Sequence, residues 1–151
     1  MPTIEMPDVN VLIALFDPEH IHHNTAQDWF SLASQQAWCT CPLTENGFLR
    51  IVSKPNYPGV RWNVAEAAAR LAALISNHPS SYRFYADSIS LCDSGLFNWR
   101  TVQGSNQLTD LYLLGLCQQH HATLVTFDSG IRETVRGVIE ARHDLVRLLV
   151  V

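Results

Sequence analysis

Long hydrophobic runs are missing from this sequence. None of its apolar stretches approaches the roughly 18 residues that cross a membrane. The N-terminus carries Glu5 and Asp8 and has no basic start, so it does not read as a secretory signal. We therefore expect a cytoplasmic chain. Apolar residues make up 47% and charged residues 16% of its 151 residues, a balance typical of a globular protein rather than a disordered one.

Basic residues, and lysine above all, are scarce. Ten bases face 14 acids, which gives a formal net charge of −4, and Lys54 is the single lysine among nine arginines. This balance argues against a generic nucleic-acid coat, which needs a large basic surface. It does not exclude nucleic acid as a ligand, because arginine can bind a phosphate through two N–H groups and is better suited to this than lysine.

Spacings typical of zinc sites are also absent. Cys39 and Cys41 alternate on what reads as a strand, and no CxxC pair completes a site. A cytosolic chain of this length needs no disulfides, so we expect free thiols, with Cys39 and Cys41 as small buried hydrophobes. The clustered His20, His22 and His23 lack a suitably spaced acid or thiol, which favours loop or packing histidines.

The sequence does contain short apolar runs that alternate with helical patterns. The expected strands cover residues 3–6, 37–41, 82–85, 123–127 and 145–150. The expected helices begin at Val9, after a cap at Asn24, at Pro42, at Val64, near Ser88 with an interruption at Gly95, and near Gln107 after a cap at Ser105 or Asn106. This alternation predicts one α/β domain, residues 1–151, with a mostly parallel sheet covered on both faces.

Four carboxylates fall on one edge of the expected sheet. Asp8 and Asp128 follow strands, whereas Glu45 and Asp110 lie in the first turns of helices. Taken singly, each has a structural explanation, as a helix cap or as a complement to the positive helix end. Together they bring like charges to the carboxyl edge of a parallel sheet, where ligands bind. A divalent cation between them is the simplest compensation.

Carboxylate oxygens are the ligands that suit Mg²⁺ or Mn²⁺. One or two such ions would orient a water, lower its pKa and stabilise charge on a phosphodiester, without a covalent nucleophile. Apart from these four acids, the sequence has ten acids and ten bases. The whole excess of negative charge is therefore as large as the charge of the candidate site. The candidate RNA contacts are Arg50, Lys54 and Arg61, on the helix and loop after Glu45.

Several stretches also carry a family resemblance. They are PDVNVLIAL around Asp8, TEN around Glu45, TDLYLLGLC at Asp110, LVTFDSGI at Asp128 and HIHHNTAQDWF after the first helix. In order, spacing and local sequence these stretches resemble PIN-domain ribonucleases, and most of all the VapC toxins of bacterial VapBC toxin–antitoxin pairs. The resemblance spans essentially the whole chain.

This resemblance implies a fold, an activity and partners. The fold is a three-layer α/β/α domain, the activity is that of a Mg²⁺- or Mn²⁺-dependent endoribonuclease, and the partners are a second copy in a homodimer and a small VapB antitoxin whose tail covers the site. The residues carried over are the metal-binding acids Asp8, Glu45, Asp110 and Asp128, with Asn10 and Thr126 as supporting polar groups. One departure is Ser129, where many relatives have a basic residue.

Three other protein classes share parts of this pattern. A phosphoacceptor receiver domain needs a lysine late in the chain, and the single lysine is Lys54. An aspartate-nucleophile phosphatase needs a second aspartate two residues after the first, and that residue is Asn10. A catalytically idle PIN-like module that binds RNA or a protein ranks second, behind the nuclease, because all four acids are present.

Overall fold

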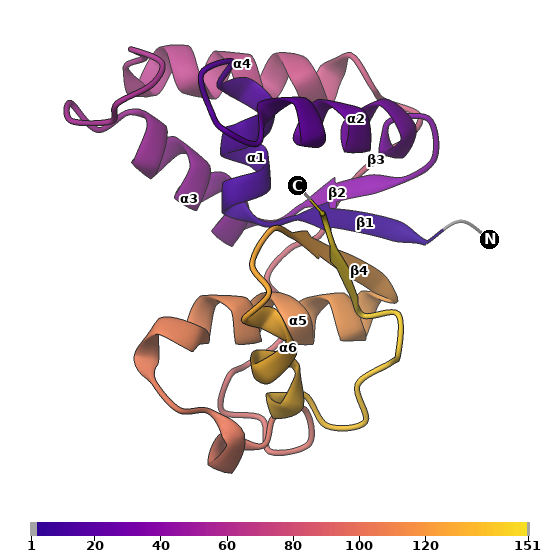
Figure 1. Ribbon diagram of the computed structural model, residues 1–151. Helices are drawn as coiled ribbons and strands as arrows, with labels where there is room; N and C mark the ends of the chain where they lie inside the picture. Colours follow the sequence, from indigo (N-terminus) through magenta and orange to yellow (C-terminus); the bar gives the residue numbers. More distant parts are fainter. Residues whose placement is uncertain (1–2, 151) are drawn as a thin grey trace.

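The computed structural model describes residues 3–150, which form a five-stranded sheet between two layers of helices (Figure 1). The strand order is β3-β2-β1-β4-β5, and every neighbouring pair is parallel. Helices α1 to α4 cover one face of the sheet, and α5 and α6 cover the other (Figure 1). The expected three-layer α/β/α architecture is therefore confirmed. The strands are β1 (Ile4–Pro7), β2 (Trp38–Thr40), β3 (Tyr82–Phe84), β4 (Ala122–Thr126) and β5 (Val146–Leu148).

The helices alternate with the strands along the chain. The α-helices are α1 (Val9–Phe16), α2 (His23–Ala33), α3 (Pro42–Val52), α4 (Val64–Ser76), α5 (Leu108–His120) and α6 (Ile131–Thr134). Short 3₁₀ turns are η1 (Trp99–Thr101), η2 (Ser105–Gln107) and η3 (Val135–Gly137). The expected loop between Ser53 and Asn63 does connect α3 to α4.

Strand β1 lies at the centre of the sheet. It pairs with β4 from Ile4 opposite Ala122 to Pro7 opposite Val125, and on its other side it pairs with β2. The chain builds one side of the sheet through β2 and β3, then returns to build the other side through β4 and β5. In open α/β sheets, ligands bind at the carboxyl ends of strands where the order reverses in this way. The end of β1, next to Asp8, is that point.

Two helices are apolar almost all round, because each is covered on more than one side. In α1 every residue from Val11 to Leu15 is buried, and neighbouring helices α2 and α3 pack against it. In α5 the buried stretch runs from Leu113 to Cys117, as its sequence predicted. No helix within residues 3–150 has both the length and the apolar character needed to cross a membrane.

The expected helix near Ser88 to Trp99 was wrong. The Ser90 hydroxyl accepts the Cys92 N–H at 3.0 Å, and Asp93 Oδ1 accepts the Gly95 N–H at 2.8 Å. These local turns replace helical hydrogen bonds, as serine and aspartate side chains often do. Phe97 then pairs with Val138 in an isolated antiparallel bridge, which holds the segment next to the residue that follows η3.

Two expected helix caps were also wrong. Helix α2 begins at His23, before Asn24, and its first turn is tied to α1 because His23 Nδ1 lies 2.7 Å from the Ala14 carbonyl oxygen. The segment before α5 continues as the 3₁₀ turn η2, so Ser105 and Asn106 do not cap α5 with their side chains. A contact with α1 thus accompanies the earlier start of α2, and a local 3₁₀ turn leads directly into α5.

Candidate functional site

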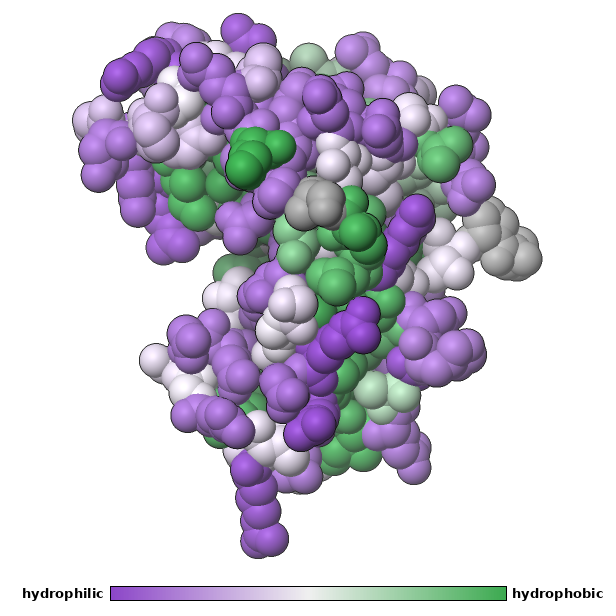
Figure 2. All heavy atoms as spheres, in the orientation of Figure 1, coloured by the Kyte–Doolittle hydropathy of each residue, from purple (hydrophilic) through white to green (hydrophobic). Residues whose placement is uncertain are grey.

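A cavity of about 260 Å³ lies at the carboxyl edge of the sheet, between helix α3 and the N-terminal turns of α1 and α5. Two of the predicted acids, Asp8 and Asp110, line it, together with Asn10 and Arg50. In the space-filling view the outline of the molecule narrows at the left, between the two helical layers (Figure 2). We call the 260 Å³ cavity the acid-lined cavity.

Asp8 stands at the junction of β1 and α1. Its backbone N–H donates to the Val125 carbonyl of β4 at 2.9 Å, and its Oδ1 accepts the Val11 N–H at 2.9 Å as the cap of α1. Only 6% of the residue is exposed. Burial raises the pKa of the Asp8 carboxyl to about 6; hydrogen bonds from Thr126 and Val11 lower it in part, and the charges of Asp110 and Asp128 raise it further.

Asp110 and Asp128 lie in the same region, Asp110 on α5 and Asp128 just after β4. Asp110 is half-buried in the first turn of α5, and its pKa is raised by burial and by the charge of Asp128. Asp128 is exposed, two residues beyond the end of β4, and its Oδ1 accepts the Gly130 N–H at 2.8 Å. Three aspartates therefore influence one another electrostatically at this edge.

Glu45 lies on the same edge but faces different neighbours. Pro42 occupies the first turn of α3, and the Thr44 hydroxyl accepts the Cys41 N–H at 3.1 Å, which places Glu45 in the first turn as predicted. Its Oε2 accepts the Thr40 hydroxyl at 2.7 Å and the Tyr82 hydroxyl at 3.4 Å. The Glu45 side chain is thus held by hydroxyl groups of β2 and β3.

Gly47 has no side chain, which lets α3 approach Val9, the residue after Asp8. A Cβ atom at Gly47 would lie 2.7 Å from Val9 Cγ2, which is closer than real side chains allow. The start of α1 and the first half of α3 can therefore pack directly against each other. Arg50, one turn beyond Gly47 in α3, lines the same cavity as Asp8 and Asp110.

Of the two supporting polar residues, Thr126 lies buried between the aspartates, and Asn10 lies on the rim of the acid-lined cavity. The Thr126 hydroxyl accepts the Asp128 N–H at 3.1 Å and its side chain also hydrogen-bonds Asp8. Asn10 is exposed and lines both the acid-lined cavity and a second cavity, of about 390 Å³, beside Asp128. Thr126 thus links two acids, whereas Asn10 separates two openings.

The second cavity involves two of the clustered histidines. His20 and His22 line it together with Phe127, and the His22 and Phe127 rings lie 4.6 Å apart. His20 Nδ1 accepts the His22 N–H at 3.0 Å. Burial and the neighbouring His22 lower the pKa of His20. These contacts agree with the packing role expected for the cluster.

The three candidate RNA contacts separate in the structure. Arg50 lines the acid-lined cavity with an exposed side chain. Lys54 and Arg61 are exposed in the connection between α3 and α4 and line none of the cavities described here. Arg50 is therefore the basic residue best placed to meet a phosphate beside the aspartates.

The four acids have no basic partner in the part of the chain that the structure describes. The ion pairs among residues 3–150 are Arg136–Glu133, Arg142–Asp144 and Arg147–Glu5. In the same residues, no three His, Cys, Asp or Glu side chains lie together closely enough to hold a metal ion as they stand. The donors are nevertheless all oxygens, and their charges are uncompensated, so they fit Mg²⁺ or Mn²⁺ in kind and in sign.

Sequence reasoning missed three residues of this region. Thr109 lines the acid-lined cavity beside Asp110, and Thr40 and Tyr82 hold Glu45. Thr40 ends β2 and Tyr82 begins β3, and the two elements are neighbours in the sheet. The neighbourhood of β2 and β3 was the only available signal, because hydroxyl residues follow no spacing rule.

Comparisons with known proteins agree with this architecture. A family model described as "PIN domain" matches residues 6–137. Among curated proteins of Mycobacterium tuberculosis, the chain is similar to ribonuclease VapC44, with 37% identity over 127 residues, 84% of this chain and 87% of that protein. It is 39% identical to ribonuclease VapC38 over 124 residues, 82% and 84% of the two chains. For ribonuclease VapC39 the values are 37% over 134 residues, 88% and 95%.

Proposed function

The chain belongs to the PIN domain family, and from this premise we propose that it is a metal-dependent endoribonuclease, the toxin of a type II toxin–antitoxin pair. Its relatives VapC44, VapC38 and VapC39 carry the name ribonuclease and match it over most of their length. The substrate of this activity is RNA, and the reaction is hydrolysis of a phosphodiester.

One observation carries the proposal: a buried aspartate is surrounded by like charges at the ligand-binding edge of the sheet. Asp8 is 6% exposed, and its pKa is raised to about 6 by burial and by Asp110 and Asp128. Such an arrangement lowers stability unless a cation compensates it, so a purely structural role does not account for it. A site that binds a divalent cation does.

The acids have separable roles in the proposed reaction. Asp8, Asp110 and Asp128 would hold the cation through their carboxylate oxygens. When bound, Mg²⁺ or Mn²⁺ supplies a water of lowered pKa and neutralises charge on the phosphate. Thr126 fixes the orientation of Asp8 through its hydroxyl, and Arg50 positions a phosphate at the opening of the cavity.

Glu45 would take part from the first turn of α3. Thr40 and Tyr82 donate to its Oε2, which leaves Oε1 available to accept a proton or to complete the cation site. We propose the second use, because the resemblance to VapC toxins assigns all four acids to the metal site. Asn10, on the rim, would bind RNA or water between the two cavities.

The proposed partners follow from the same relationship. A VapB-like antitoxin would inhibit the enzyme by covering the acid-lined cavity, and the enzyme would act as a homodimer in the cytoplasm, where its RNA substrates are found. Co-expression with the protein encoded beside it should give a stable complex and restore growth. Unimpaired growth on expression of the chain alone would favour the catalytically idle module instead.

The direct test uses the purified chain, total RNA and controlled metal. We expect cleavage with Mg²⁺ or Mn²⁺, none in excess EDTA, and recovery when the metal is restored. Undiminished cleavage in EDTA would contradict the metal mechanism. A preparation that binds RNA but never cleaves it, with either metal, would contradict the proposed activity and leave a binding module.

A further inference from the structure

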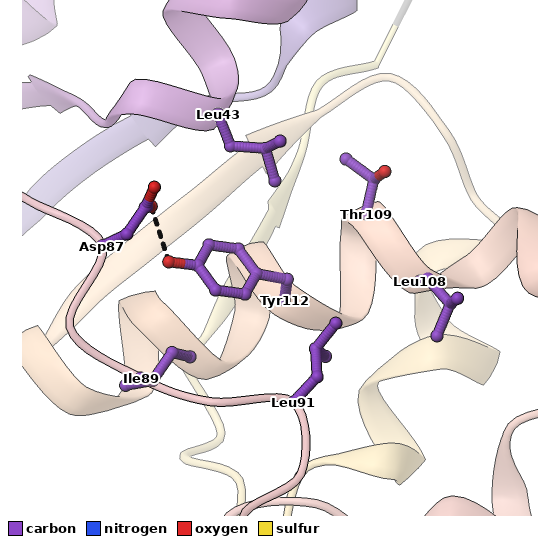
Figure 3. Close-up of a pocket in the computed structure, with 7 residues that line it drawn as sticks. All are labelled: Leu43, Asp87, Ile89, Leu91, Leu108, Thr109 and Tyr112. Carbon is purple, nitrogen blue, oxygen red and sulfur yellow. Dashed lines mark hydrogen bonds between the residues drawn. The ribbon is translucent and has the colours of Figure 1, made fainter.

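A third pocket adjoins the acid-lined cavity and, unlike it, has mostly apolar walls (Figure 3). Its volume is about 360 Å³, and it shares Leu43 of α3 and Thr109 of α5 with the acid-lined cavity. The two spaces therefore meet across these side chains. The apolar walls of this pocket are Leu43, Ile89, Leu91 and Leu108.

A carboxylate stands at one side of this pocket. Asp87 belongs to the segment after β3, and its Oδ1 accepts the hydroxyl of Tyr112 at 2.6 Å (Figure 3). Tyr112 lies one turn along α5 from Thr109, the remaining polar residue of the lining. The tyrosine hydroxyl holds the carboxylate in one orientation, and the other oxygen, Oδ2, remains available to a ligand. We call this space the Asp87 pocket.

The segment that carries Asp87 is fixed at several points. The Tyr85 N–H donates to the Thr40 carbonyl at 3.0 Å, and the Tyr85 ring stacks on His120 with centroids 4.3 Å apart. Ser88 Oγ lies 3.1 Å from His120 Nε2. Ile89 packs close to α5 because residue 115 is a glycine, where a Cβ would lie 2.9 Å from Ile89 Cδ1. The pocket is thus built by specific contacts on both sides of Asp87.

The chemistry of the Asp87 pocket selects a base rather than a phosphate. Asp87 is the one charged residue in its lining, so a phosphate would be repelled, while the leucine and isoleucine side chains suit the flat face of a nucleobase. A carboxylate only accepts hydrogen bonds. On its Watson–Crick edge guanine presents two neighbouring N–H donors, whereas the carbonyl groups of uracil would face the carboxylate unfavourably.

We propose that the Asp87 pocket binds an unpaired guanine of the RNA next to the phosphodiester that is cut. RNA-binding proteins read unpaired bases in this way, by apolar contact with the ring and hydrogen bonds to its edge. The inference rests on the proposed ribonuclease activity, because the shared wall of Leu43 and Thr109 places the base beside the acids. Asp87 then determines specificity, and Tyr112 positions it.

The test sequences the ends produced from an oligoribonucleotide pool with randomised positions, cut by the purified chain with Mg²⁺ or Mn²⁺. We expect guanine to be enriched at one fixed position beside the cut. Asp87→Asn replaces one acceptor with a donor, and should reduce this enrichment about tenfold. Tyr112→Phe should reduce it less, because the carboxylate stays but loses its fixed orientation.

Asp93→Asn is the matched control. It makes the same charge change in the same segment, outside the Asp87 pocket, and asparagine can still accept the Gly95 N–H. Its cleavage pattern should equal that of the wild type. Enrichment that is absent in the wild type, or that persists in Asp87→Asn, would overturn the proposal.

A binding measurement separates this inference from the proposed activity. Guanosine monophosphate should shift the backbone amide resonances of Thr109 and Tyr112, and uridine monophosphate should shift them at least several-fold less. This result stands even if the chain cuts no RNA. Equal shifts with both nucleotides would overturn the proposal. The proposal would also be overturned if Asp87→Asn left the cleavage ends unaltered but lost the complex with the antitoxin. That result would assign the pocket to a protein partner.

Discussion

The two sides of the sheet's carboxyl edge hold their acids in opposite ways. Beside β2 and β3, Glu45 receives hydroxyl hydrogen bonds from Thr40 and Tyr82, and these groups satisfy one carboxylate oxygen within the protein. Beside β1 and β4, Asp8 is more deeply buried, and the charges of Asp110 and Asp128 raise its pKa. On the β2 and β3 side, hydrogen bonds within the protein compensate the charge of Glu45. On the β1 and β4 side, hydrogen bonds lower the pKa of Asp8 only in part, which is why we propose a cation there.

This difference explains why no acid can be judged by its local role alone. Asp8 does cap α1, as a structural explanation requires, through its contact with the Val11 N–H. A cap at the surface would serve that purpose without burial and without two neighbouring aspartates. The cap therefore accounts for the position of Asp8, and the proposed cation site would account for its surroundings.

The largest expected effect is on catalysis at the β1 side. Asp8→Asn should lower RNA cleavage by more than roughly a hundredfold, since even groups that only support a metal ligand are worth 10–100-fold. Asp110→Asn should do the same, and both variants should stay folded. The measurement is the initial rate on one RNA at saturating Mg²⁺. Cleavage within tenfold of the wild type would remove these residues from the proposed site.

The next effect is on stability, and it depends on pH. In metal-free buffer the folded protein has an Asp8 pKa of about 6, whereas the ordinary pKa of an aspartate is 3.8. Between these values the folded state binds more protons, so wild-type stability falls as pH rises, and the loss is complete above about pH 6. Asp8→Asn lacks this loss and retains the cap. It should therefore be more stable at neutral pH, by up to ~3 kcal/mol.

Thermal unfolding of both proteins from pH 4 to 8 in EDTA measures this difference. The advantage of Asp8→Asn should grow with pH through that window. Asp8→Ala is the control, because it removes the charge and the cap together, and should be about 1 kcal/mol less stable than Asp8→Asn at each pH. A difference between wild type and Asp8→Asn that stays constant with pH would contradict the electrostatic account.

The smallest effect is expected on the Glu45 side. Tyr82→Phe removes a hydroxyl 2.5 Å from Thr40 Oγ1 and 3.4 Å from Glu45 Oε2. Thr40 still donates to Glu45, so stability should fall by about 1 kcal/mol and cleavage by less than roughly tenfold. Tyr57→Phe makes the same change at a hydroxyl bound to Asp17, and should leave cleavage unaltered. A loss as large as that of Asp8→Asn would mean that the two sides are not different in kind.

The fold was largely predictable because its strands are short buried runs between helical patterns. All five strands lie within two residues of the expected bounds. The exception was the expected helix after Ser88, where side-chain turns at Ser90 and Asp93 and the bridge from Phe97 to Val138 prevail. Local pattern could not reveal a bridge to a residue so distant in the chain.

The site was predictable in position but not in detail. Parallel strands bring their carboxyl ends to one edge, so the sequence indicated that Asp8, Glu45, Asp110 and Asp128 share it. Which acids influence one another depends on side-chain direction and burial, and neither follows from spacing. The Asp87 pocket was missed for the same reason, because the contact between Asp87 and Tyr112 joins segments that no motif relates.

The central position of β1 has a consequence for synthesis of the chain. β1 is translated first, but its neighbour β4 and the helix that carries Asp110 come more than 100 residues later. A nascent chain that ends before Asp110 holds Asp8 and Glu45 without the other two acids. On the proposed assignment, the nuclease acquires its full set of acids only after its last third has left the ribosome. An unfinished copy of the enzyme would then lack part of its proposed site.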